Sequence, residues 1–378
     1  MDVKLDVCAY TIPTDAPEAD GTFAWTSTTV DVVRAHLDGH TGLGWTYAPA
    51  AAAAVIRELL VPALDGGRRE PASGAWGDLV GDDPQLDDVP AAWERMRAAL
   101  RNAGRVGIGS LALSAVDCAL WDLLARRRGL PLAGLLGSCR DAVPVYGSGG
   151  FTSYDDEQLH RQLSGWVHGE GIPRVKIKIG EDGGRRVGRD LARIAAARRT
   201  IGDGVELYVD ANGAYSRKQA VRVGHAFAEH DVTWFEEPVT SDDLVGLAQV
   251  RDALSCDVAA GEYGFDLPYF ARMLPSVDCL QIDVTRCGGF TEFARAAALA
   301  AAAGLEVSGH CAPHQHLPVA AATANLRHLE WFHDHVRIES MLLDGAAPAP
   351  DGLLRVDPTA PGNGLTFREP DAEPFRCA

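Results

Sequence analysis

The chain of 378 residues is 47% hydrophobic and 23% charged, proportions that are ordinary for a globular enzyme. Its 52 acidic and 35 basic residues give a formal net charge of −17. That charge argues against a protein that binds nucleic acids or anionic membranes, because both need basic surfaces.

The first part of the chain predicts a small α+β domain. Residues 1–60 contain three runs that alternate in strand fashion, KLDVCAYTI, STTVDVVRAHL and GLGWTYA. The segment PTDAPEADGTFAW between the first two is rich in Pro, Asp and Gly, so we expect a long mobile loop there. From about residue 49 to 130 apolar residues recur at helical spacing, and the last helix ends normally in arginines followed by Gly129.

From residue 143 onward, predicted strands alternate with helical stretches such as RDLARIAAARR and TEFARAAALAAAAG. The eight strand-like runs are VPVYGSG, VKIKIG, ELYVDAN, VTWFEEP, DVAAGE, CLQIDV, EVSGH and HLEWF. Strict alternation predicts an all-parallel sheet, and eight units predict that the sheet closes into a barrel. We expect a capping domain over residues 1–130, a barrel domain over 140–345 and a C-terminal segment over 346–378 that returns to the capping domain.

The chain gives no sign of export or membrane insertion. No apolar run approaches the roughly 18–20 residues of a membrane-spanning helix. The N-terminus, MDVKLDVCAYTI, lacks the basic segment, apolar core and cleavage site of a signal peptide. The eight cysteines are scattered with no C-x-x-C pair, which is typical of reduced thiols, so we expect a cytoplasmic protein.

Most predicted barrel strands end in an acidic or basic residue, at the end of the barrel where active sites are built. These residues are Lys178, Asp210, Glu236, Glu262, Asp283 and His310. The three consecutive carboxylates, with no Cys or His among them, form a hard oxygen site that suits Mg²⁺ or Mn²⁺. Glu236 and Glu237 point opposite ways on a strand, and the spacing favours Glu236 as the ligand and Glu237 as a neighbour or helix-side partner.

The run VKIKIG places two lysines on one face of a strand. Lys176 and Lys178 share that face, while Val175, Ile177 and Ile179 share the other. The aliphatic face meets the helix layer, so both lysines point inward. On an edge strand they would simply be solvated, but a closed barrel has no edge, and interior lysines are costly unless paired.

Together these motifs resemble the mandelate racemase subgroup of the enolase superfamily. The resemblance is carried by Lys176-x-Lys178, Asp210-x-Asn212, Glu236-Glu237-Pro238, Gly261-Glu262, Asp283 before Gly288-Gly289, His310, Glu330 and the segment ALSAVDCALWDLL. It covers nearly the whole chain and implies a modified (β/α)7β barrel of the TIM type, closed by an N-terminal α+β capping domain. It also implies a symmetric homo-oligomer.

The resemblance further implies a role for each residue of the site. Asp210, Glu236 and Glu262 would bind Mg²⁺. Lys178 would be the base on one face of the substrate, and His310, oriented by Asp283, would be the acid or base on the opposite face. The substrate carboxylate would contact Lys176 and Glu330, the latter as a carboxylic acid, and the further candidates for substrate binding are Ser148 and Asn212.

Cycloisomerising relatives carry a lysine where Asp283 stands, and no lysine lies near it here, which argues against that subgroup. Two features lie outside a tight match. Arg286 stands where relatives often carry a lysine, and its role stays open. His314 and His316 could form a second metal site, line a polar pocket or pair with the cap.

The predicted chemistry is Mg²⁺-assisted removal of the proton α to a substrate carboxylate, through an enediolate that the metal stabilises. Mg²⁺ and Lys176 should lower the pKa of Lys178, and Asp283 should favour protonated His310. Loss of a β-hydroxyl would then dehydrate an acid sugar, an aldonate or an aldarate, to a 2-keto-3-deoxy acid. A polar rim of His314 and His316 would suit such a substrate.

Two alternatives remain open. Protonation from the opposite face would racemise or epimerise a 2-hydroxy acid or a sugar acid. A barrel that binds an acidic ligand or a metal without turnover would need the acids but not the bases. Substrate identity should lie in PTDAPEADGTFAW and in the loop near Trp45–Pro49.

Overall fold

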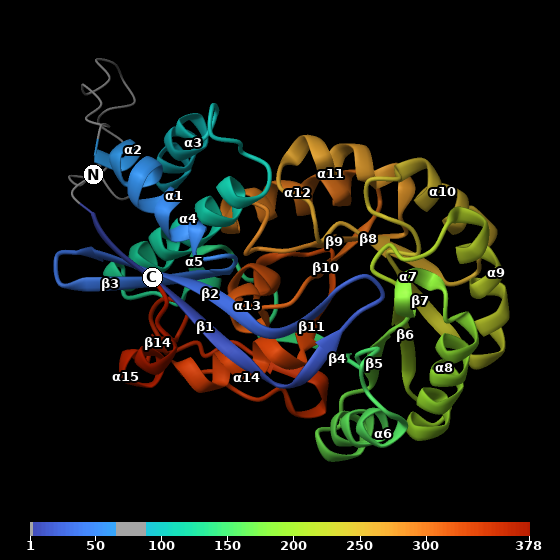
Figure 1. Cartoon of the computed structure of the whole chain (residues 1–378). Coiled ribbons are helices and arrows are strands. Elements are labelled where there is room, and N and C mark those ends of the chain that lie inside the picture. The colour runs from blue at the N-terminus through green and yellow to red at the C-terminus, as the bar shows by residue number, and fades with distance from the viewer. Residues whose placement is uncertain (1–2, 66–87) are drawn as a thin grey trace.

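The structure, a computed structural model, describes residues 3–65 and 88–378. Its N-terminal part is an antiparallel sheet in the order β1 (Lys4–Ala19), β2 (Ala24–Leu37) and β3 (His40–Tyr47). Helices pack on one face of this sheet: α1 (Ala51–Val55), the π-helical turn Ile56–Leu60, α2 (Val61–Asp65), α3 (Val89–Ala99) and α4 (Ile108–Arg127). We call these elements the cap (Figure 1).

The prediction of a long loop between the first two strands is wrong. β1 and β2 extend through most of PTDAPEADGTFAW as a hairpin, with a register shift between Pro13 and Glu18. Asp20 Oδ1 accepts the N–H groups of Thr22 (2.6 Å) and Phe23 (2.7 Å), which closes the turn. Because β1 is an edge strand, its prolines remove no hydrogen bond from a sheet interior.

Helix α4 is the central helix of the cap. It packs closely on β3, because Gly42 and Gly44 have no side chains to separate the two elements. Among the described residues it is the one helix that is long and apolar enough to span a membrane, but 83% of its apolar window is buried inside the structure. Such burial is typical of a core helix.

Eight parallel strands form a closed barrel, as predicted. In ring order they are β4 (Ala142–Gly149), β5 (Arg174–Lys178), β6 (Glu206–Asp210), β7 (Val232–Glu236), β8 (Asp257–Ala260), β9 (Cys279–Ile282), β10 (Glu306–Gly309) and β11 (Leu326–Phe332). The ring closes because β11 pairs in parallel with β4. The predicted fold, a TIM-type barrel with an N-terminal cap, is confirmed.

Helices surround the barrel (Figure 1). They are α6 (Asp156–Ser164), α7 (Glu181–Gly184), α8 (Val187–Ile201), α9 (Arg217–Phe227), α10 (Leu244–Ala253), α11 (Leu267–Met273), α12 (Gly289–Ala302), α13 (Pro313–Ala322) and α14 (His333–Leu342), with α5 (Leu132–Leu135) ahead of the barrel. Val175, Ile177 and Ile179 belong to the large core between strands and helices. Lys176 and Lys178 therefore face the barrel interior, where they are 0% and 5% exposed.

The C-terminal segment contacts both the barrel and the cap. β13 (Leu353–Arg355) pairs with β4, and β12 (Leu343–Asp344) pairs with β14 (Thr366–Phe367). After α15 (Glu369–Ala372) the chain runs along β1, where Cys377 N donates to Ala9 O at 2.9 Å. The domain boundaries 1–130, 140–345 and 346–378 stay a prediction.

Candidate active site

A cavity of about 480 Å³ lies between the carboxyl ends of the barrel strands and the cap. The barrel side is lined by Lys178, Asn212, Glu262, Tyr263, Arg286, His310, Cys311, Phe332 and His335. The cap side is lined by Asp20, Phe23, Trp25, Ser27, Thr28, Thr29, Tyr47, Ala48 and Pro49. Both cap segments singled out in the sequence therefore face the same space as the strand-end residues.

Three buried carboxylates meet at this end of the barrel. Strand register pairs Lys178 with Asp210 and Asp210 with Glu236 on neighbouring strands. One oxygen each from Asp210, Glu236 and Glu262 lies within 4.8 Å of the other two. All three side chains are buried, and Glu262 Oε2 accepts no hydrogen bond from the described residues, although His310 Nε2 lies 3.2 Å from it. Three converging hard oxygen donors fit a divalent cation such as Mg²⁺.

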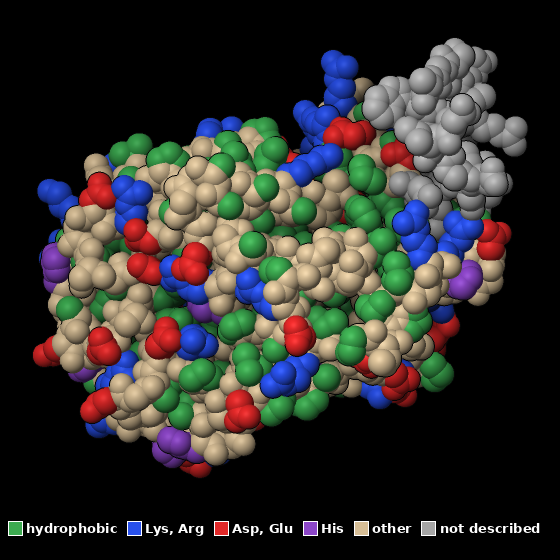
Figure 2. Space-filling model, turned by 180° about the vertical axis from the view of Figure 1, so that it is seen from behind, with side chains coloured by type: hydrophobic (Ala, Val, Ile, Leu, Met, Phe, Trp, Pro, Cys, Tyr) green, Lys and Arg blue, Asp and Glu red, His purple; other side chains and the backbone are tan. Residues whose placement is uncertain are grey.

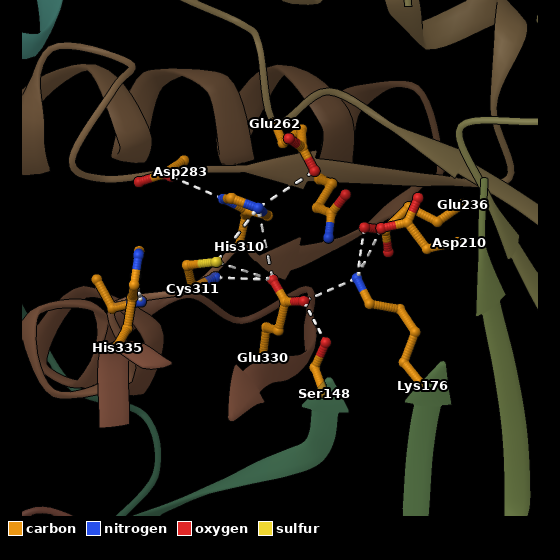
Figure 3. Close-up of polar contacts among 12 residues, drawn as sticks. Ser148, Lys176, Asp210, Glu236, Glu262, Asp283, His310, Cys311, Glu330 and His335 are labelled. Atoms are coloured by element: carbon orange, nitrogen blue, oxygen red, sulfur yellow. Dashed lines mark hydrogen bonds and ion pairs between the residues drawn. The ribbon is translucent and has the colours of Figure 1, made fainter. Parts of the chain in front are cut away.

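Both lysines of β5 pair with these carboxylates (Figure 3 labels Lys176). Lys176 Nζ contacts Glu236 and lies 2.8 Å from Glu330 Oε1, and Lys178 Nζ lies 2.5 Å from Asp210 Oδ2. Burial disfavours the charged ammonium groups, but the carboxylates outweigh burial and raise the pKa of both lysines. The expected lowering of the Lys178 pKa stays a prediction for the Mg²⁺-bound protein. There the cation would offset the negative charge of Asp210 that raises this pKa.

His310 forms a pair with Asp283. His310 Nδ1 and Asp283 Oδ2 are 2.8 Å apart, an arrangement that orients the imidazole ring. Burial alone would raise the pKa of Asp283, but the hydrogen bond from His310 lowers it to about 2. Burial opposes a charged imidazole, yet neighbouring Cys311 and Glu262 outweigh it and raise the pKa of His310 well above its usual value. The pair therefore holds a protonated histidine next to an ionised aspartate.

The contacts of Glu330 favour its ionised form. Ser148 Oγ donates to its Oε1 at 2.6 Å, and Cys311 N donates to its Oε2 at 2.9 Å. Burial would raise its pKa, but the ammonium group of Lys176 holds the pKa of Glu330 well below its usual range. The carboxylic acid that the resemblance implies here stays a prediction for the protein with Mg²⁺ and substrate bound. Ser148, a candidate for substrate binding, is the partner that holds Glu330.

Asn212 and Arg286 line the cavity in different ways. Asn212 has a φ of +44°, its N–H donates to Asp210 Oδ1 at 2.8 Å, and its buried Oδ1 has no partner among the described residues. Its amide oxygen is therefore free to accept a hydrogen bond from a ligand. Arg286 lies 3.2 Å from Glu262 Oε1 and 3.3 Å from Asp283 Oδ2. Arg286 thus ties the carboxylate cluster to the Asp283–His310 pair.

The structure does not place His314 and His316 at the rim of the cavity. His314 Nδ1 lies 2.6 Å from Glu339 Oε2 and its Nε2 lies 2.8 Å from Ala347 O. His316 Nε2 accepts Val284 N–H at 2.9 Å, and its Nδ1 donates to Ala312 O at 3.0 Å. Both rings are buried and fully partnered. Neither belongs to a metal-binding cluster of the described residues. Neither lines the cavity, so the polar-rim prediction is wrong.

Four residues on the barrel side of the cavity were not predicted from the sequence: Tyr263, Phe332, Cys311 and His335. Cys311 Sγ lies 3.3 Å from His310 Nε2, and the residue has a left-handed φ of +53°. Its position directly after His310 at a strand end was the available signal. His335 stacks on Tyr47 with ring centroids 3.4 Å apart, and burial lowers the pKa of His335 to about 3. Nothing in the sequence marked His335, because it lies in the helix after the last barrel strand.

Two known protein families together match most of the chain. Residues 29–137 match the family described as mandelate racemase/muconate lactonizing enzyme, N-terminal domain, and residues 158–372 match the one described as enolase C-terminal domain-like. L-talarate/galactarate dehydratase from Salmonella typhimurium is 32% identical over 314 residues, which cover 82% of this chain and 74% of that protein. Other relatives are named as arabinonate, gluconate and rhamnonate dehydratases, as sugar-acid cycloisomerases and as a hydrophobic dipeptide epimerase.

Solved structures show the same architecture. A mandelate racemase/muconate lactonizing enzyme-like protein from Rubrobacter xylanophilus superposes with a TM-score of 0.90 at 45% identity, covering 99% of each chain. A racemase from Streptomyces coelicolor with bound magnesium superposes with a TM-score of 0.85 at 29% identity, again over 99% of each chain.

Proposed function

The chain belongs to the mandelate racemase/muconate lactonizing enzyme family of the enolase superfamily, and from this premise we propose that it is a Mg²⁺-dependent acid-sugar dehydratase. The observation that carries the proposal is the contact of the Asp210–Glu236–Glu262 cluster with Lys178 and the Asp283–His310 pair. Glu262, Lys178 and His310 of this set line the cavity. Relatives named as acid-sugar dehydratases support the choice of reaction.

Asp210, Glu236 and Glu262 would hold the metal ion. When bound there, Mg²⁺ would supply positive charge next to the substrate carboxylate and offset the field of Asp210 at Lys178. The Lys176 ammonium group, held by Glu236 and Glu330, would add a hydrogen-bond donor to the same carboxylate.

Lys178 and His310 approach the substrate from different parts of the ring. Lys178 ends β5 and His310 follows β10, with two strands between them on one side of the barrel and four on the other. Neutral Lys178 takes the α-proton, and the enediolate that results expels the β-hydroxyl. Protonated His310 gives its proton to that hydroxyl as the C–O bond breaks, so water leaves and the enol becomes a 2-keto-3-deoxy acid.

A second candidate is racemisation or epimerisation. The same two groups support it, because His310 could return a proton to the opposite face of the α-carbon. The relative named as a hydrophobic dipeptide epimerase supports this second candidate. A barrel that binds without turnover is not favoured, because the relatives are enzymes and every base of the site is present.

The deciding experiment is proton NMR of the protein with Mg²⁺ in D₂O against hexonates, aldarates and simple 2-hydroxy acids. We expect loss of the α-proton signal together with signals of a keto-acid product. Exchange or inversion without loss of water would replace the dehydratase by an isomerase. No exchange with any acid would overturn the proposed reaction.

A further inference from the structure

The two ends of the cavity differ in their charged groups. Its inner end carries the basic groups already described, whereas its outer wall is the β1–β2 hairpin and the residues after β3. A sugar acid would hold its reacting carboxylate at the inner end, so the outer wall meets the far end of the substrate. The charges of the outer wall therefore decide which group the substrate can carry at its far end.

The cap wall, as far as the described residues form it, contains no lysine or arginine. Its lining consists of hydroxyl groups, small residues, three aromatic rings and one carboxylate: Ser27, Thr28, Thr29, Ala48, Pro49, Phe23, Trp25, Tyr47 and Asp20. The rings of Phe23 and Trp25 lie 6.1 Å apart at 14°, and Trp25 also packs edge-on against Phe151 at 5.7 Å. These residues offer ring faces and the Ser27 hydroxyl group but no positive charge. Thr28 Oγ1 already donates to Asp334 Oδ2, and Thr29 Oγ1 bonds with Thr11 Oγ1.

The cations on the barrel side are already engaged. Lys178 lies 2.5 Å from Asp210, and Arg286 lies 3.2 Å from Glu262 and 3.3 Å from Asp283. His310, which also lines the cavity, lies 2.8 Å from Asp283 and 3.2 Å from Glu262. Arg286 also sits over the Tyr263 ring at 5.0 Å. A second substrate carboxylate would have to compete with these carboxylates for the same cations.

A charge taken from water without a partner is strongly disfavoured, and a like charge nearby adds repulsion. A second carboxylate at the cap wall would meet the first condition, because no lysine or arginine of the described cap wall could pair with it. Asp20 adds repulsion only in its ionised form, and burial raises the pKa of Asp20 while nearby Lys178 lowers it. A hydroxylated, uncharged end would instead meet the Ser27 hydroxyl group and the aromatic faces of the cap wall.

We infer that the site takes mono-carboxylates with an uncharged hydroxylated tail, and discriminates against diacids. The inference rests on the proposed function and narrows it from aldonates or aldarates to aldonates. The inferred substrate preference differs from that of the Salmonella relative, whose named substrates are diacids. The lack of a cation on the described cap wall carries this preference, and Asp20 would add to it in its ionised form.

The test compares pairs that share the configuration of every carbinol centre: D-gluconate with D-glucarate, D-galactonate with galactarate, and D-mannonate with D-mannarate. Binding is measured by calorimetry on the Mg²⁺-loaded wild type, and turnover is followed separately by NMR. We expect the best aldonate to bind at least about tenfold more tightly than its aldarate, a difference of about 1.4 kcal/mol. An aldarate that binds as tightly as its aldonate overturns the inference, whether or not it is turned over.

Two variants examine the cause. Asp20→Asn keeps an oxygen that can accept the Thr22 and Phe23 N–H groups but removes the charge, so the aldonate-to-aldarate preference should fall three- to tenfold. Phe23→Arg places a cation on the cap wall and should tighten aldarate binding about tenfold. The matched control is Asp203→Asn, an exposed residue between α8 and β6 at the opposite end of the barrel, which should leave the preference unchanged.

The outcomes separate this inference from the proposed reaction. Preferential aldonate binding without dehydration would support the inference and overturn the reaction. Dehydration of aldarates as efficiently as aldonates would support the reaction and overturn the inference. An unchanged preference in both Asp20→Asn and Phe23→Arg would overturn the role of the cap wall, and binding of neither class would overturn inference and reaction together.

Discussion

The residues of the site form one network of opposite charges. Its members are the carboxylates Asp210, Glu236, Glu262, Asp283 and Glu330 and the basic groups Lys176, Lys178, Arg286 and His310. Because a buried charge without a partner is costly, each member holds its neighbours in position. A substitution at any of them therefore changes both the chemistry and the local charge balance, and the two effects have to be measured separately.

Lys178→Ala should slow α-proton exchange by about 10²–10⁴-fold, the range expected when a positioned base is removed. The measurement is the rate of deuterium incorporation by proton NMR, with circular dichroism to verify the fold. Lys218→Ala is the matched control, because Lys218 is exposed on α9 and should keep the wild-type rate. Wild-type exchange in Lys178→Ala would remove this lysine from the mechanism.

Strand geometry explains which site residues could be predicted. On a strand the side chains alternate between two faces, so the inward direction of Lys176 and Lys178 and the convergence of Asp210 and Glu236 follow from the sequence. His314 belongs to helix α13, whose placement depends on packing rather than on a repeating pattern. The ionised form of Glu330 is favoured by its 2.8 Å contact with Lys176, which no spacing in the sequence specifies.

At the scale of elements, the cap depends on close packing between β3 and α4. A Cβ at Gly44 would lie 2.3 Å from Ala115 O and 2.5 Å from Ala119 N. Gly44→Ala must therefore push the helix from the strand, and we expect it to lower the free energy of unfolding by about 1–3 kcal/mol. Chemical denaturation measures the change.

Gly188→Ala is the control for this substitution. Gly188 lies in α8, and a Cβ there would have open space within 4 Å, so alanine should be neutral or stabilise the protein by about 0.5–1 kcal/mol. Equal stability of the Gly44→Ala and Gly188→Ala proteins would contradict the packing argument.

The barrel strands could be predicted better than the cap hairpin. Each barrel strand is a short apolar run bounded by helical patterns. Both the run itself and the patterns on either side of it indicate where the strand lies. In the hairpin, Pro13, Pro17 and Asp20 gave loop composition to what is an edge strand with a register shift. Edge strands tolerate such residues because one side of their backbone is unpaired, so composition alone could not separate the two cases.

At the scale of the whole molecule, charge is spread rather than concentrated. On the face shown in Figure 2, basic side chains are interspersed with acidic ones and form no continuous basic area among the described residues. A site metal would be a local positive charge in a chain with a formal net charge of −17. The expected symmetric homo-oligomer stays a prediction, which light scattering measures directly.

Mg²⁺ should stabilise the whole protein. A ligand that binds only the folded state at 100 times its Kd adds about 2.7 kcal/mol, so Tm should rise by a few degrees and return on chelation with EDTA. Glu262→Gln removes one carboxylate of the cluster and should lose most of this rise. Glu229→Gln, at a side chain that is 78% exposed, should keep it, and an equal rise in both variants would contradict the assigned metal site.

Stability should fall as the pH rises from about 4 to about 7, because of acids buried away from the site. Asp31 is 0% exposed, its Oδ1 accepts Ala53 N–H at 3.2 Å, and its Oδ2 has no partner among the described residues. Burial raises the pKa of Asp31 to about 7, so in this range the folded state holds a proton that the unfolded state has released. One such group lowers the free energy of unfolding by at most about 1.4 kcal/mol per pH unit.

Asp31→Asn removes that titration, so the decline in stability between pH 5 and 7 should become shallower. Part of the decline should remain, because burial also raises the pKa of Asp117 to about 7. Urea denaturation at successive pH values gives the slope. Asp203→Asn, an exposed site, should keep the wild-type slope. If Asp31→Asn and wild type declined in parallel, Asp31 would be ionised in the folded protein, and its burial would have to be offset by a partner outside the described residues.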